Sequence, residues 1–223
     1  MRPDRQQAIL LAAEKLFAQR GYHAVTIRQI ADEAGVPLAL VGYYFGPKHD
    51  LFHAVFAHWN RTIEERLAAL DAALAAPAST RRLERIVEAF VRPVIRMRAS
   101  AEGQYYALLV GRELGYSSQE ADRVLREFFD PMATRFIDAL HAVLPHASRA
   151  DVAWGYQFAL GALLHHLVDT RVARLSDGLN VPSDPAAADR LVRFIVGGLR
   201  AAWPLRAPPV RHARSKTPRR KPA

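Results

Sequence analysis

Side chains able to react or to hold a metal are few in this chain of 223 residues. It has no cysteine, which removes thiol nucleophiles, disulfides and thiolate metal sites. We find no Gly-rich phosphate loop, no paired-carboxylate motif and no Ser-His-acid set. His165 and Asp169 would share one face of a helix, but two side chains are too few for a metal site. The sequence therefore predicts a binding protein with no catalytic residue, metal or cofactor.

One cation lies where it could bind an anionic ligand. Arg112 follows the mostly apolar stretch from Tyr105 to Gly111, and a guanidinium can hold a carboxylate or phosphate through paired hydrogen bonds. A ligand held there would be an apolar acid such as a fatty acid, an acyl thioester or an aromatic acid. Alternatively, Arg112 is exposed or paired near Glu113 at a helix end, because arginine is seldom buried without a partner.

The elements that must position these residues are all helical. Apolar residues recur with a period of about 3.6, and no stretch alternates as a strand would. Gly21 is placed to end the first helix in a left-handed conformation, Thr26 with Gln29 forms a capping box, and Ser148 with Asp151 caps a later helix. We predict an all-α protein of about nine or ten helices.

Three further boundaries follow from the same signals. One amphipathic helix is predicted to run from Leu51 past Trp59 to about Leu74. Asp130-Pro131 is predicted to cap and begin a helix, and residues 174–184 are predicted to be a loop.

Two short helices are predicted at residues 27–34 and 38–45, joined by Gly35-Val36-Pro37. This is the helix-turn-helix pattern, whose second helix can enter the major groove of DNA. Short helices also occur as connectors, so the pattern alone leaves both interpretations open.

A longer stretch decides between them. Residues 5–56 resemble the DNA-binding domain of TetR/AcrR-type regulators in the order and spacing of Gly21-Tyr22, Val25-Thr26-Ile27-Arg28-Gln29-Ile30-Ala31, Ala34-Gly35-Val36, Tyr43-Tyr44-Phe45-Gly46-Pro47-Lys48 and Leu51-Phe52. Less specifically, residues 84–200 are similar to the effector domain of a subgroup that includes regulators of fatty-acid catabolism, through Phe90-Val91-Arg92-Pro93-Val94 and Phe158-Ala159-Leu160-Gly161-Ala162.

The resemblance implies a set of DNA contacts. Arg28 would reach a phosphate or a base edge, Tyr44 would donate to a phosphate, and Lys48 would bind the backbone beside a helix N-terminus. Thr26 would cap its helix close to the DNA. The exposed side of the recognition helix would consist of Pro37, Leu38, Ala39, Gly42 and Tyr43.

The chain departs from the family at two of these positions. Many members have Ser or Thr where this chain has Pro37, and Tyr where it has Gly42. Residues 38–45 also include no Arg, Lys, Asn or Gln, so the recognition helix cannot form bidentate hydrogen bonds to bases. Readout would then depend more on Arg28, on Arg2 and Arg5, and on the shape of the DNA.

The resemblance also implies an effector pocket and a homodimer. The dimer would form through the helices near residues 150–171 and 185–203, and its two recognition helices would read a palindrome. A pocket between helices is expected in the second domain. Its candidate lining residues are Met97, Tyr105, Leu109, Arg112, Phe128, Met132 and Phe158.

Charge is concentrated at one end of the chain. The net charge is +9, of which residues 204–223 carry +7 and residues 1–60 carry +1. We expect the basic segment to be a disordered tail that either aids solubility or anchors the protein to phosphate. No apolar run reaches the ~18 residues of a membrane span, and a signal-peptide core is absent, so a cytoplasmic protein is expected.

The sequence thus predicts a helix-turn-helix domain over residues 1–50, an effector-binding and dimerisation domain over 51–203, and the tail. The predicted function is a transcriptional regulator, a repressor released from a palindromic operator by a small apolar effector. Alternatively, the protein activates transcription. Two other functions are open: a DNA-coating protein driven by the basic tail, and an all-helical enzyme.

Overall fold

The computed structural model describes residues 4–113, 118–182 and 184–203. The basic segment 204–223 and Arg2 lie outside these ranges. Every regular element within them is helical, which confirms the predicted all-α fold. The elements are α1 (Arg5–Arg20), α2 (Ile27–Ala34), α3 (Leu38–Phe45), α4 (Lys48–His58), α5 (Asn60–Ala75), α6 (Arg82–Ala99), α7 (Gln104–Glu113), α8 (Gln119–Val124), the π-helical turn η1 (Leu125–Phe129), α9 (Asp130–Val143), α10 (Arg149–Val168), α11 (Val172–Leu175) and α12 (Ala187–Ala202).

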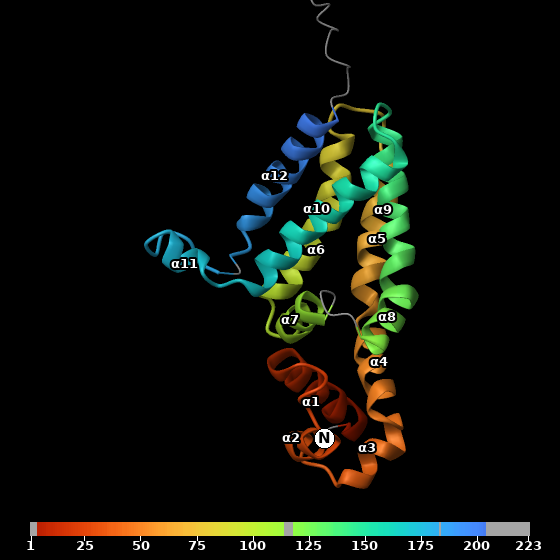
Figure 1. Ribbon diagram of the computed structural model, residues 1–223, viewed down its shortest axis with the longest axis vertical. Helices are drawn as coiled ribbons and strands as arrows, with labels where there is room; N and C mark the ends of the chain where they lie inside the picture. The colour runs from red at the N-terminus through yellow and green to blue at the C-terminus, as the bar shows by residue number, and fades with distance from the viewer. Residues whose placement is uncertain (1–3, 114–117, 183, 204–223) are drawn as a thin grey trace, which may run out of the picture.

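The helices form a small unit at one end of the molecule and a larger body above it (Figure 1). Helices α1, α2 and α3 make up the small unit, and α4 leads from it into the body. The body consists mainly of α5, α6, α9, α10 and α12, while α7 lies between the body and α1. The predicted domain boundary after residue 50 falls inside α4, so one helix connects the two parts.

Both predicted capping boxes are confirmed. The Gln29 amide donates to Thr26 Oγ1 at 3.3 Å, and the Thr26 amide donates to Gln29 Oε1 at 2.9 Å. Ser148 and Asp151 exchange the same two bonds, each 3.1 Å long. These bonds satisfy amides that the first turn of α2 and of α10 leaves free.

One predicted helix boundary was wrong, and a second was right in position but lacks the predicted cap. The single helix expected from Leu51 to Leu74 is divided at Trp59, whose buried indole donates to Glu14 Oε2 at 2.7 Å. Helix α9 begins at Asp130 with Pro131 in its first turn, as predicted, but Asp130 makes no capping bond, because its amide donates to Leu125 O in the π-helical turn that joins α8 to α9. This wider turn precedes Pro131, which has no amide hydrogen to give to a regular helix.

Two smaller expectations also changed. Gly21 has a positive φ of 84°, but its ψ of 154° is outside the left-handed helical region. The loop predicted over residues 174–184 is partly helical, because α11 extends to Leu175. When α8 is counted with α9 and the four-residue α11 is left out, the described residues form ten helices, which agrees with the nine or ten predicted.

Candidate DNA-binding face and effector cavity

The helix-turn-helix is held by a few buried side chains. Ile30 and Ala31 of α2 and Val41 of α3 are almost fully buried. Gly35 ends α2 in the left-handed conformation, with φ 64° and ψ 36°, and this turn directs the chain into α3. Because α3 buries only Val41 completely, most of its surface is free to meet a ligand as large as DNA.

The predicted DNA-contact residues lie at the surface of this unit. Tyr43 is 79% exposed and Tyr44 is 37% exposed, and their rings pack edge to face. Lys48 is half-buried. The remaining predicted residues are all exposed: Thr26, Arg28, Pro37, Leu38, Ala39 and Gly42.

Lys48 already contacts another side chain of the protein. Its Nζ lies 4.3 Å from the centre of the Tyr22 ring, and partial burial lowers the pKa of this lysine. No side chain caps the first turn of α4 at Pro47. Lys48 is also the first residue of α4, and the uncapped amides of that first turn favour an anion such as a phosphate.

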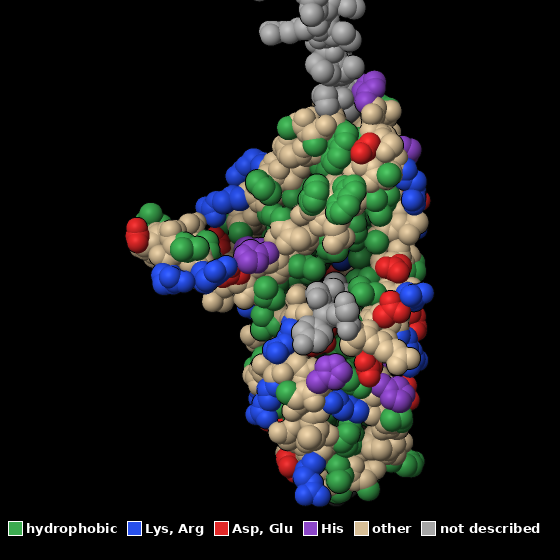
Figure 2. Space-filling view, viewed as in Figure 1, with side chains coloured by type: hydrophobic (Ala, Val, Ile, Leu, Met, Phe, Trp, Pro, Cys, Tyr) green, Lys and Arg blue, Asp and Glu red, His purple; other side chains and the backbone are tan. Residues whose placement is uncertain are grey.

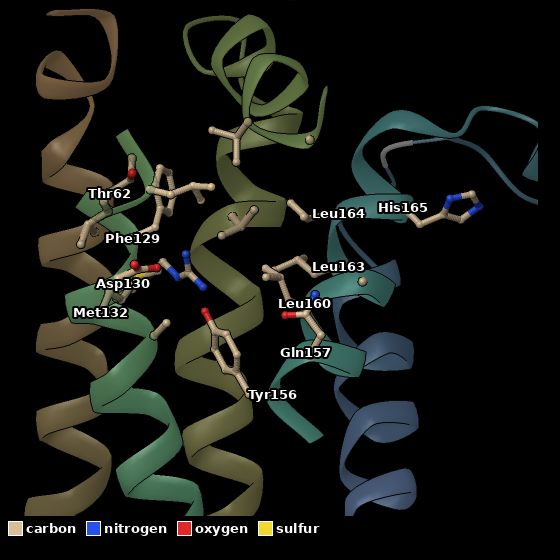
Figure 3. A pocket seen from close by; sticks show the side chains of 18 of the residues that line it. Thr62, Phe129, Asp130, Met132, Tyr156, Gln157, Leu160, Leu163, Leu164 and His165 are labelled. Carbon is tan, nitrogen blue, oxygen red and sulfur yellow. The ribbon is translucent and has the colours of Figure 1, made fainter. Parts of the chain in front are cut away.

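A second candidate site is a cavity of about 750 Å³ inside the helical body. Figure 3 shows Thr62, Phe129 and Met132 on one side of it, facing Tyr156 and Leu160. Most of its wall is apolar. Such a size and lining suit a small organic molecule.

The structure places two of the predicted ligand-binding residues, Met97 and Met132, in the cavity wall. The other five do not line it. In each case an adjacent residue does, because the helix presents the neighbouring position to the cavity. Tyr106, Val110, Gly111, Phe129 and Gln157 line the cavity in place of Tyr105, Leu109, Arg112, Phe128 and Phe158.

Arg112 and Phe158 have other surroundings. Arg112 donates to the carbonyl oxygens of Gln19 and Arg20 at 3.2 and 3.3 Å, at the C-terminal end of α1. It is exposed and lies at a helix end, as its alternative interpretation predicted, although it bonds carbonyl groups rather than an acid. Phe158 is 65% exposed.

Arg66 is a functional candidate that the sequence analysis missed. It lines the cavity and is only 6% exposed. Its Nε and Nη2 atoms are buried with no hydrogen-bond partner, and the guanidinium lies 4.7 Å from the ring centre of Phe90. Burial lowers the pKa of Arg66. Its spacing from Ile63 and Leu70, three residues after one and four before the other, was the signal that could have placed it on the buried face of α5.

The wall of the cavity reaches the surface along α10. Gln157, Gly161, His165 and Val168 line the cavity and remain exposed. Their spacing places them on the face of α10 that also carries the exposed Trp154 and Phe158.

Hydrophobic side chains gather at the surface over the upper body (Figure 2), where Figure 1 places α10 and α12. The exposed large hydrophobic residues of these two helices include Trp154, Phe158 and Phe194, which are 62%, 65% and 72% exposed. Trp154 and Phe158 stack with ring centres 5.7 Å apart.

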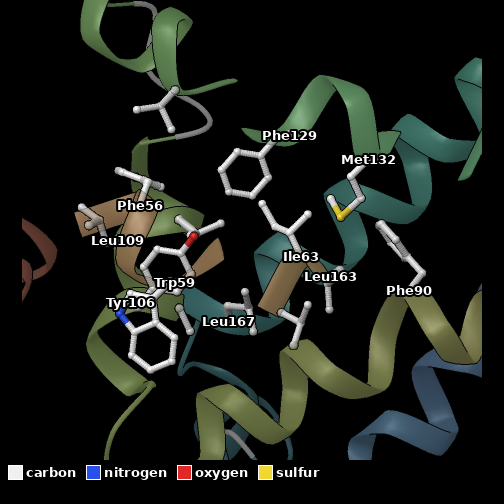
Figure 4. Packing of buried hydrophobic residues seen from close by; sticks show 14 of the residues in the cluster. Phe56, Trp59, Ile63, Phe90, Tyr106, Leu109, Phe129, Met132, Leu163 and Leu167 are labelled. Carbon is white, nitrogen blue, oxygen red and sulfur yellow. The ribbon is translucent and has the colours of Figure 1, made fainter. Parts of the chain in front are cut away.

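Aromatic contacts connect the cavity to the DNA-binding unit. Tyr106 lines the cavity and stacks on Trp59, with ring centres 5.1 Å apart and planes 11° from parallel (Figure 4). Trp59 in turn donates to Glu14 of α1. Burial raises the pKa of Glu14 to about 7. Together with Arg112, this chain of contacts makes α7 and Trp59 the links between the cavity and α1.

His165 and Asp169 do meet on one face of α10, with 2.9 Å between His165 Nε2 and Asp169 Oδ2. Asp169 also accepts from Arg171, which lowers the pKa of Asp169. Among the described residues, no group of three or more His, Cys, Asp or Glu side chains is placed to hold a metal ion. Nor does this part of the chain contain a helix long and apolar enough to cross a membrane.

Comparison with known proteins agrees with this geometry. Residues 9–55 match the family described as bacterial regulatory proteins, tetR family, and residues 88–198 match the tetracyclin repressor-like C-terminal domain. The chain is similar to the HTH-type transcriptional activator FasR of Mycolicibacterium smegmatis, with 36% identity over 89% of this chain and 84% of FasR. It is 30% identical to the HTH-type transcriptional regulator BetI of Brucella suis over 86% of this chain and 89% of BetI.

Solved structures share the fold at lower identity. The fatty acid degradation regulator FadR of Bacillus halodurans aligns with a TM-score of 0.63 and 19% identity, over 90% of this chain and 98% of FadR. The hemolysin II regulator HlyIIR aligns with a TM-score of 0.61 and 19% identity, over 89% of this chain and 98% of HlyIIR. The matched families and relatives are regulators of transcription, not enzymes. The chain belongs to the TetR family and is a DNA-binding transcriptional regulator.

Proposed function

We propose that this regulator binds a two-fold symmetric operator as a homodimer in the cytoplasm and is released from it by a small, largely apolar effector. The observation that carries the proposal is the chain of contacts from the internal cavity to α1, which packs against α2 of the helix-turn-helix. A ligand that alters the position of Tyr106 would act on Trp59 and Glu14, and through them on α1. The effector must bind the released conformation more tightly, or the equilibrium does not move.

The homodimer would form through α10 and α12. Trp154, Phe158 and Phe194 leave large aromatic surfaces in water, and aromatic side chains are common at the centres of protein interfaces. Gly161, Gly197 and Gly198 have no atom within 4 Å of where a Cβ would stand, so space beside them is open to a partner helix. Pairing would set the separation of the two α3 helices to that of successive major grooves.

The test is binding to the DNA upstream of the protein's own gene, compared with random DNA of equal length. Salt should be near physiological, because a basic tail gives affinity for any DNA at low salt. We expect Tyr43→Ala to weaken binding to the upstream fragment by about tenfold or more while binding to random DNA stays the same. Leu179→Ala is the matched control, since Leu179 is 87% exposed but lies outside the helix-turn-helix.

Removing residues 204–223 separates this function from the DNA-coating alternative. A sequence-specific regulator keeps its preference for the upstream fragment without the tail, whereas a coating protein loses binding to both fragments. Equal binding of the full chain to both fragments at physiological salt would contradict the proposal of a local operator.

Activation is a second candidate for the sign of control, because FasR is named as an activator. A reporter gene placed behind the bound fragment distinguishes the two. Expression that rises when the protein is absent indicates a repressor, and expression that falls indicates an activator.

A further inference from the structure

Arg66 is a buried cation without a counter-charge inside the cavity. We propose that the effector is a free acid whose anionic group pairs with Arg66, an inference that rests on the effector control proposed above. A buried charge is costly unless it is paired and hydrogen-bonded. No described carboxylate forms an ion pair with Arg66. Asp130 also lines the cavity, but its side chain belongs to an exposed residue and does not approach the guanidinium within ion-pair distance.

The unpartnered atoms of Arg66 suit a carboxylate. Nε and Nη2 form one edge of the guanidinium, and both are buried without a hydrogen-bond partner. Two N–H groups on one edge can donate in parallel to the two oxygens of a carboxylate. Phe90 and Phe136 pack beside the guanidinium, with ring centres 4.7 and 5.7 Å from its Cζ atom. The edge formed by Nε and Nη2 is the part of Arg66 that is open to hydrogen bonds from a ligand.

Tyr106 supplies a further donor in the same cavity. Its hydroxyl is buried and has no hydrogen-bond partner, and burial raises the pKa of this tyrosine, so the hydroxyl keeps its proton. Arg66 and Tyr106 both line the cavity. An anion bound there would satisfy three donors that the protein leaves unsatisfied, two on Arg66 and one on Tyr106. Tyr106 is also the residue that stacks against Trp59.

The rest of the cavity fixes the chemical class. Met97, Phe129, Met132 and Leu163 give it an apolar wall, so the body of the ligand is a hydrocarbon chain or ring. Arg66 itself is almost completely buried, which places the charge of the ligand inside the protein. An acyl thioester would instead bury its neutral acyl chain against Arg66. A free monocarboxylic acid satisfies the guanidinium, whereas the thioester leaves it unpaired.

The test uses the full chain and paired probes: octanoic, dodecanoic, benzoic and phenylacetic acids, each with its primary amide, together with dodecanoyl-CoA. Calorimetry at neutral pH gives their affinities. We expect at least one acid to bind about tenfold or more tightly than its amide, and dodecanoic acid to bind more tightly than dodecanoyl-CoA. Arg66→Met should remove the difference between acid and amide. Tyr106→Phe should reduce it several-fold, because the ring remains and one donor is lost.

Folding of the variant is checked in the same samples. Arg66→Met replaces an unpaired buried charge by an apolar side chain of similar length, so the ligand-free variant should melt at a higher temperature than the wild type. Arg96→Met, which removes an exposed guanidinium paired with Glu65, is the control and should leave the preference for the acid unchanged.

Three results would overturn the proposal: every acid binding no better than its amide, the preference surviving in Arg66→Met, or none of the acids binding. Failure of the proposed function is distinguishable. An acid that binds through Arg66 but leaves operator affinity unchanged supports the site and contradicts effector control.

Discussion

The buried carboxyl of Glu14 is a residue whose ionisation affects folding. Its pKa is about 7 in the folded protein, against 4.5 for an ordinary glutamate, because burial disfavours the charge. A raised pKa gives stability that is complete below about pH 4.5 and is lost as pH rises through about 7. The wild type should therefore lose up to about 3 kcal/mol of unfolding free energy between pH 5 and pH 8 from this group.

Glu14→Gln tests this expectation, because the amide oxygen can still accept from Trp59. Urea unfolding at several pH values should show that the variant lacks this loss. Glu64→Gln, an exposed change on α5, should follow the wild-type pH dependence. If the unfolding free energies of the wild type and Glu14→Gln changed with pH in parallel, ionisation of Glu14 would not affect the stability of the fold.

Arg112 connects α7 to the end of α1 and does not line the cavity. Arg112→Ala removes two hydrogen bonds to the end of α1 and should lower stability by about 1 kcal/mol. We expect the affinity for a bound acid to stay within about twofold, because Arg112 does not line the cavity. The effect of that acid on operator affinity should become smaller.

Calorimetry and operator titration of the same variant check both parts. Arg126→Ala is a suitable control, since Arg126 pairs with Asp122 one turn away on its own helical segment. A large loss of acid affinity in Arg112→Ala would return Arg112 to the effector site.

Among the elements, α2 depends most visibly on a short sequence signal. Thr26→Ala removes one of the two bonds of its capping box and should lower the unfolding free energy by about 1 kcal/mol. Thr26→Ser keeps the oxygen and should be nearly neutral. Urea denaturation measures both, and equal stability of the two variants would mean that the cap does not stabilise the folded state.

Signals of this local kind explain how much of the fold could be predicted. The starts of α2 and α10 and the end of α2 follow from capping residues and glycine, which act within a few positions of the chain. The break at Trp59 could not be predicted in the same way, because Trp59 continues the apolar stripe and its partner Glu14 is 45 residues away. Pro131 does mark the start of α9, but a π-helical turn precedes it instead of a cap at Asp130.

The cavity shows that the sequence did not reveal which of two adjacent helical positions faces inward. The predicted residues lie on helices that border the cavity, yet only Met97 and Met132 face it, and neighbours of the other five do so in their place. An α-helix turns by about 100° per residue, so one position separates a cavity wall from the core or the surface. Arg66 was missed for a related reason: it lies in a charged run with Glu64 and Glu65, and such runs usually face water.

For the whole molecule, the exposed aromatic residues of α10 and α12 predict the oligomeric state. A glutamate in place of Phe158 or Phe194 would have to be desolvated in the proposed interface, so each variant should be monomeric at micromolar concentration where the wild type is dimeric. Analytical ultracentrifugation measures this. Leu38→Glu, a similar change on the DNA-binding face, should remain dimeric, and dimers in all three variants would place the interface elsewhere.

The position of the cavity opening has a kinetic consequence. Gln157, Gly161, His165 and Val168 border the cavity on the face of α10 that would meet the partner. In the proposed dimer, the route by which an effector leaves would be covered by the second subunit, and escape would wait for the subunits to separate or shift. The rate of effector release, followed by stopped-flow after dilution, should then rise when Phe158→Glu weakens pairing. Such a regulator would remain in the effector-bound state for some time after the effector concentration has fallen.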